Sequence, residues 1–171
     1  VLVTDADGSI GGGATGLFDY DTRILSKYRL LVDNDAPRCD TSTAIASDYW
    51  AAHLTVPRPD RDAHGPPLPQ DALAIEVRRR VGRGMVEQLI VRNFSMAATN
   101  VTLRLELDAD FTDLMAPGVD PPYKRRTRRL WDGRTGTLTF DHCAEANGRQ
   151  LHRASRIRIV HADSSPADSG N

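Results

Sequence analysis

Alternation of apolar and polar residues with a period of two is the main pattern along this chain. It is clearest in residues 101–107 and 73–78, where Leu, Ile or Val alternates with polar or small residues. Because successive side chains of a strand point to opposite faces, this period predicts half-buried β-strands. Glycines within 82–84 separate the second of these segments from another apolar-rich one, 85–92, which predicts a β-hairpin.

Apolar content and flanking turn residues predict further strands. They are 24–32, which ends before an Asp33-Asn34-Asp35 turn, and 50–56, 125–131, 136–142 and 155–161. No segment keeps apolar residues at positions i, i+3, i+4 and i+7 through three turns, as an amphipathic helix would. The sequence therefore predicts an all-β fold, an antiparallel β-sandwich of many short strands with little helix.

The length of 171 residues suits one domain with a substantial core. Two proline-rich segments, 57–69 and 116–123, are expected to be surface loops because proline cannot donate to a strand ladder. The polar end of the chain contains no apolar anchor. We therefore expect a β-sandwich domain over residues 1–162 and a linker or disordered tail over 163–171.

Charge and cysteine content exclude several classes of protein. The 22 basic and 23 acidic side chains nearly cancel, so no global field favours nucleic acid or an anionic membrane. No apolar run approaches the roughly 18 to 20 residues that a membrane helix needs. Cys39 and Cys143 are far apart in the sequence, with no CxxC spacing, and we expect no signal peptide. We expect a cytoplasmic protein with no nucleic-acid or membrane partner.

Neither a metal site nor a bound cofactor is expected. Asp5-x-Asp7-Gly8 begins like a calcium loop, but at the fifth and twelfth loop positions, where oxygen ligands are needed, Ser9 offers only a hydroxyl and Gly16 has no side chain. The five histidines lack the HxH and HExxH spacings of zinc sites. The glycines between residues 8 and 16 lack the βαβ frame that a nucleotide-binding loop requires.

The segment 19–23 carries two carboxylates and a guanidinium at alternate positions, Asp19, Asp21 and Arg23. In an extended strand they would share one face, with the two acids roughly 6.5 to 7 Å apart at Cα, a spacing that an inverting glycosidase could use. A general acid, however, needs a raised pKa, whereas Arg23 would neutralise either carboxylate. We therefore predict a structural clamp at the strand entry, and no catalytic residue.

Residues 123–131 hold five cations and two aromatic residues. They suit an anionic partner, a surface that stacks on sugar rings, or a solvated strand whose cations face the acidic stretch 108–113. Tryptophans on strands are more often core or interface anchors than sugar platforms. The candidates for contact with a glucan or a neighbouring domain are Phe18, Trp50, Arg126, Arg128 and Trp131.

Four segments resemble one family in both order and spacing. They read LVTDADG, GLFDYDTRILSKYRLLVDN, ALAIEVRRRVGRGMVEQLIVRNFS and VTLRLELDADFTDLM. They are similar to the N-terminal domain of bacterial glycogen debranching enzymes of the amylo-α-1,6-glucosidase type, from Val1 to about Val119 and more loosely to His161. The most specific parts are Gly16-Leu17-Phe18 with Asp21-Thr22-Arg23, and the run 108–114.

The resemblance implies a supersandwich-like β-module that precedes an (α/α)6 catalytic domain, which is then its partner. In that family the catalytic domain carries the two carboxylates that cleave α-1,6 branch points, and these have no matching positions here. The resemblance therefore implies a non-catalytic accessory domain that supports the catalytic domain and lines part of the glucan groove. The alternatives are a free-standing carbohydrate-binding module for α-glucans and an interaction domain with no sugar contact.

Overall fold

The computed structural model describes residues 1–57, 71–96, 98–114, 124–146 and 148–160, and these residues form an all-β fold. The strands are β1 (Leu2–Val3), β2 (Gly16–Asp19), β3 (Thr22–Leu25), β4 (Lys27–Val32), β5 (Arg38–Ala46), β6 (Tyr49–Val56), β7 (Leu73–Val81), β8 (Met85–Asn93), β9 (Leu103–Asp108), β10 (Lys124–Asp132), β11 (Thr137–Ala146) and β12 (Arg149–Arg158). Every strand pair is antiparallel, and the described residues include no helix, so the predicted fold class is confirmed.

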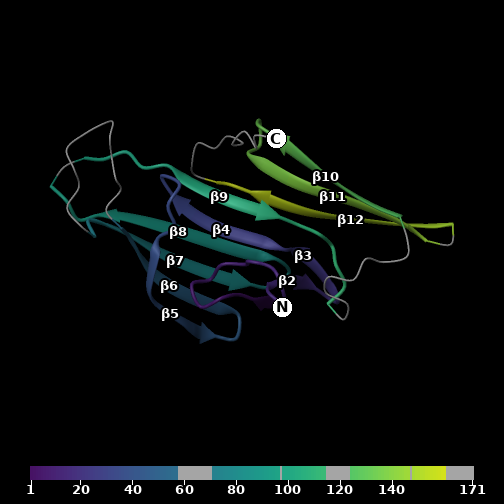
Figure 1. Cartoon of the computed structure of the whole chain (residues 1–171), viewed down its shortest axis with the longest axis horizontal. Coiled ribbons are helices and arrows are strands. Elements are labelled where there is room, and N and C mark those ends of the chain that lie inside the picture. Colours follow the sequence, from purple (N-terminus) through teal and green to yellow (C-terminus); the bar gives the residue numbers. More distant parts are fainter. Residues whose placement is uncertain (58–70, 97, 115–123, 147, 161–171) are drawn as a thin grey trace.

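The strands form four hydrogen-bonded sheets. Their orders are β1-β2-β3, β4-β9, β5-β6-β7-β8 and β10-β11-β12. Figure 1 shows the β5–β8 sheet along one side of the molecule and the β10–β12 sheet on the other, with β4 and β9 between them. With no helix among the described residues, none of them could cross a membrane as a helix.

The main core lies between the β5–β8 sheet and the layer that contains β2, β3, β4 and β9. The inward residues of β7 include Ile75 and Val77, which alternate with Glu76 and Arg78 as the sequence pattern predicts. Opposite them lie Tyr28, Leu30 and Val32 of β4, at the same period of two. Burial of these alternate positions provides the main driving force for pressing the two layers together.

A second, smaller core lies beneath the β10–β12 sheet. Phe140 of β11 packs there with Ala109 and Phe111, which follow β9. The ring of Phe111 stacks on the buried His142, with 4.7 Å between ring centroids. Ser155 of β12 donates a 2.6 Å hydrogen bond to a backbone carbonyl of β3, so this sheet is also joined to the main layer.

The predicted hairpin is present as β7 and β8, and the Asp33-Asn34 turn has positive φ at both residues. The predicted strand 24–32 is instead two strands, separated at Ser26. β12 begins at Arg149 rather than 155, and β5 was not predicted at all. Both are exposed edge strands in which few apolar residues alternate, so no local pattern marks them. Residues 58–69, 116–123 and 163–171 of the predicted loops and tail lie outside the described residues.

Candidate functional site

The segment that carries Asp19 and Asp21 forms a tight hairpin rather than one extended strand. β2 ends at Asp19, which pairs with Thr22 at the start of β3. Tyr20 has a φ of 49°, a left-handed conformation that reverses the chain within two residues. The extended arrangement expected for residues 19–23 is therefore wrong, because a turn separates the two acids from Arg23.

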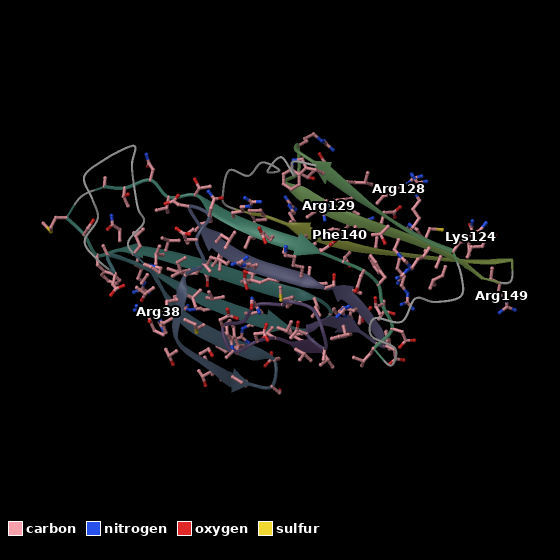
Figure 2. All side chains as sticks on the ribbon, viewed as in Figure 1. Arg38, Lys124, Arg128, Arg129, Phe140 and Arg149 are labelled. Atoms are coloured by element: carbon pink, nitrogen blue, oxygen red, sulfur yellow. The ribbon has the colours of Figure 1, made fainter. Side chains whose placement is uncertain are left out.

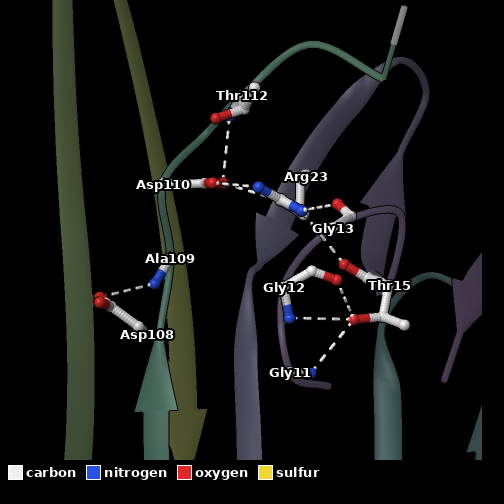
Figure 3. A network of polar contacts seen from close by, with 9 residues as sticks. All are labelled: Gly11, Gly12, Gly13, Thr15, Arg23, Asp108, Ala109, Asp110 and Thr112. Atoms are coloured by element: carbon white, nitrogen blue, oxygen red, sulfur yellow. Dashed lines mark hydrogen bonds and ion pairs between the residues drawn. The ribbon is translucent and has the colours of Figure 1, made fainter. Parts of the chain in front are cut away.

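Arg23 is the centre of a polar network that crosses the fold (Figure 3). Its Nε donates a 3.1 Å hydrogen bond to Oδ1 of Asp110, and its Nη2 forms an ion pair with Oδ2 of the same carboxylate. Its Nη1 donates to the carbonyls of Gly13 at 2.7 Å and Thr15 at 3.3 Å. One guanidinium thus joins β3, the loop that contains Gly13 and Thr15, and the segment that follows β9.

Backbone contacts reinforce this network, which we call the Arg23 clamp and which consists of Arg23, Asp110 and the Gly13 and Thr15 carbonyls. The Arg23 amide donates to the Thr112 carbonyl at 2.9 Å. Gly16 lies flat against the Arg23 side chain, since a Cβ there would be 2.5 Å from Arg23 Cδ. A glycine at this position therefore leaves the space that the guanidinium stem occupies.

The electrostatics of Asp110 favour a structural role. Partial burial raises the pKa of this carboxyl, but hydrogen bonds from Arg23 and Thr112 outweigh burial and lower it below its usual value. Asp110 therefore stays ionised at neutral pH. A general acid needs the opposite shift, so this carboxylate is suited to holding Arg23 and not to protonating a glycosidic oxygen.

The structure places Asp19 and Asp21 outside the clamp. Both side chains are exposed, and neither forms a hydrogen bond or ion pair with any residue that the structure describes. The backbone carbonyl of Asp21 accepts a 2.7 Å hydrogen bond from the Leu114 amide, which lies in the segment after β9. Of the three residues proposed as a clamp, Arg23 alone binds a carboxylate, and the partner is Asp110, 87 residues away.

The proposed aromatic contact residues are largely covered by this chain itself. Phe18 is only 5% exposed. Trp50 is half-buried against the backbone of Gly8, where a Cβ would be 2.3 Å from its Cη2. Trp131 is half-buried and pairs with Leu138, so it lies on the face of β10–β12 that covers the second core. Little of Phe18 is open to a ligand.

Arg126 and Arg128 occupy the opposite face of the same sheet. They pair with Cys143 and Asp141 of β11, whereas Trp131 alternates with them along β10. Both arginines are exposed. The structure therefore separates the two arginines from Trp131, so the three side chains do not form one sugar-stacking surface.

A buried cation that the sequence analysis missed lies in β7. Arg79 is only 1% exposed and lies between two rings, 4.6 Å from the Tyr28 centroid and 5.0 Å from the Trp50 centroid. Its guanidinium pairs with Glu87 at 2.6 Å and donates to the Gly8 carbonyl at 2.7 Å. One sequence signal could have identified Arg79 as buried. This arginine follows Ile75 and Val77 at alternate positions of the strand, and alternate side chains point to the same face.

The Asp5-x-Asp7-Gly8 segment forms a tight turn. The Ser9 amide and hydroxyl both donate to Oδ1 of Asp7, at 2.9 and 2.6 Å. This local bonding is typical of an Asx turn. Across the described ranges, no cluster of three or more His, Cys, Asp or Glu side chains could hold a metal ion.

Comparison with known proteins gives a match at the level of the family. No curated protein matches the chain significantly. The family described as the N-terminal domain of (some) glycogen debranching enzymes matches residues 1–170, which is nearly the whole chain. That range includes the β2–β3 hairpin, the Arg23 clamp and all twelve strands. The chain therefore belongs to the family of N-terminal domains of glycogen debranching enzymes.

Proposed function

We propose that this chain is a non-catalytic accessory domain that supports the (α/α)6 catalytic domain of a bacterial, cytoplasmic amylo-α-1,6-glucosidase and lines part of its glucan groove. The observation that carries the proposal is the match of residues 1–170 to an N-terminal domain of debranching enzymes. The Arg23 clamp also supports it, since its one side-chain carboxylate is neutralised by a buried arginine.

The placement of the aromatic residues supports this role over a free-standing carbohydrate-binding module. Such a module usually offers a row of exposed rings on which sugars stack, whereas buried rings belong to a core. Among the described aromatic residues, only Tyr20 and Phe94 are exposed. They lie at the β2–β3 turn and after β8, at opposite ends of the molecule (Figure 1), so they do not form one row of stacking rings.

Titration of the 171-residue chain with maltooligosaccharides, followed by NMR or calorimetry, distinguishes the two functions. An accessory domain is expected to show no saturable binding by itself. Binding with a millimolar or tighter dissociation constant would favour a carbohydrate-binding module.

Substitutions in the intact enzyme test the absence of a catalytic role. We expect Arg23→Ala to lower the melting temperature and to reduce hydrolysis only to the extent that the protein unfolds. The matched change Asp21→Asn removes an exposed carboxylate and should leave both unchanged. Abolished hydrolysis with an unchanged melting temperature, in either variant, would contradict a structural role for this segment.

A further inference from the structure

Charge is strongly segregated along this chain. Residues 124–160 contain ten Lys or Arg and only three Asp or Glu. Residues 1–114 contain twelve Lys or Arg and seventeen Asp or Glu. The formal net charge of −1 therefore hides a basic β10–β12 sheet and an acidic remainder. Such a local field favours an oppositely charged partner even where the whole protein is near neutrality.

One face of the β10–β12 sheet carries much of this positive charge. Residues at alternate positions of a strand share a face, and directly paired residues do so across strands. The register of β10, β11 and β12 therefore places one set of five exposed cations on the face opposite the second core. We call it the basic face, and its cations are Lys124, Arg126, Arg128, Arg156 and Arg158. Figure 2 labels Lys124 and Arg128 along β10.

The cations of the basic face have no acidic partner within the described part of the chain. No ion pair or side-chain hydrogen bond joins any of the five to another described residue. Some arginines elsewhere do have a carboxylate partner, as Arg23 has Asp110 and Arg79 has Glu87. On β10 itself, Arg129 points to the other face and pairs with Asp108 at 3.4 Å. In the register Lys124 lies opposite Glu145 and Arg128 opposite Asp141, but neither cation forms an ion pair with that acid, so both are available to a partner's carboxylates.

The remaining residues of the basic face favour a protein partner. Leu130 lies on it with 54% of its surface exposed. Three acids, Asp132, Asp141 and Glu145, also share this face, so its charge is mixed, unlike the uniformly basic stripe typical of a nucleic-acid-binding surface. Among the described residues no Phe, Tyr or Trp lies on this face, since Trp131 points the other way, and the imidazole of His152, which does lie on it, is bonded to Asp141. Arginine with an exposed leucine and mixed charge is typical of a protein–protein interface.

We propose that the basic face docks against a carboxylate-rich surface of the catalytic domain of the same enzyme. This inference rests on the proposed function, because that domain is the partner an accessory domain must contact. The planar guanidinium groups of Arg126, Arg128 and Arg156 are suited to bidentate bonds with carboxylates. Charge complementarity of this kind sets orientation and register more than affinity, which is what a support domain requires.

Arginine footprinting of the intact debranching enzyme with phenylglyoxal, read by peptide mass spectrometry, tests the proposal. The matched control is Arg83, an exposed arginine of the β7–β8 turn with no ion pair to a described residue. Burial in an interface excludes reagent, so we expect Arg126 and Arg128 to react about tenfold more slowly than Arg83 in the intact enzyme. In the 171-residue chain, the three should react at similar rates.

Variants and additives decide between partners. Arg128→Glu in the intact enzyme should lower its melting temperature and speed the labelling of Arg126, whereas Arg83→Glu should change neither. Equal labelling rates for Arg126, Arg128 and Arg83 in the intact enzyme would overturn the docking face. So would protection that appears only on adding RNA or maltooligosaccharide, which would assign the face to that ligand instead. The proposed function fails separately, if an enzyme that lacks residues 1–160 keeps full stability and activity.

Discussion

Removal of the Asp110 carboxylate should measure how strongly the Arg23 clamp holds the fold together. The side chain of Arg23 is 10% exposed and that of Asp110 is 35% exposed. Breaking a fully buried ion pair costs about 3 to 5 kcal/mol, whereas an exposed pair contributes below about 1 kcal/mol. In Asp110→Ala, the guanidinium keeps its bonds to the Gly13 and Thr15 carbonyls. We therefore expect an intermediate loss of about 2 kcal/mol in the free energy of unfolding.

Urea denaturation and thermal melting of the 171-residue chain check this value. At this chain length a loss of about 2 kcal/mol corresponds to a fall of about 4 to 8 °C in the melting temperature. Asp19→Asn and Asp21→Asn are the matched controls, and each should change the free energy of unfolding by less than about 0.5 kcal/mol. The reasoning is refuted if Asp110→Ala is as stable as these controls, or if either control is as destabilised as Asp110→Ala.

Three other predictions follow from buried groups. Gly8 has a φ of 82° and its added Cβ would be 2.3 Å from the Trp50 ring, so Gly8→Ala should cost about 2 to 4 kcal/mol in urea denaturation; a loss below about 1 kcal/mol would contradict this packing. Glu87→Ala leaves the buried Arg79 guanidinium without its carboxylate and should cost about 3 to 5 kcal/mol, with an unchanged midpoint as the contrary result. Burial, followed by neighbouring arginines, lowers the pKa of His142, so the unfolded state binds more protons and stability should fall as pH drops through about 6.5. His142→Phe should remove that part of the pH dependence, and an identical pH profile would exclude His142 as its source.

The strands show which elements the local alternation of apolar and polar residues can predict. β7 and β8 were predictable because Leu73, Ile75 and Val77 bury every second side chain and the Gly82–Gly84 turn follows. β5 and the first half of β12 lack that alternation because both of their faces are largely exposed. Their strand conformation comes from hydrogen bonds to β6 and β11, so it depends on neighbours that a single-segment pattern does not contain.

The clamp shows the same limit at the level of side chains. Its arginine and its acidic segment were both identifiable, since Arg23 and the run 108–114 are among the most family-specific parts of the sequence. The nearest acids in sequence, Asp19 and Asp21, were the natural partners under an extended strand. Because a two-residue turn begins at Tyr20, residues 19–23 do not form one strand with a shared face. Asp110, in the segment after β9, binds the guanidinium instead.

By itself, the sequence determined the fold class, most of the strands and the family, because side-chain alternation and motif spacing are properties of short segments. Tertiary structure alone decided that Arg23 binds Asp110, that Arg79 is buried between two rings, and that the cations of β10 divide between two faces. The physical reason is distance along the chain. Each of these features depends on which strands pair and which faces pack, and those are settled only when residues far apart in sequence meet in the folded domain.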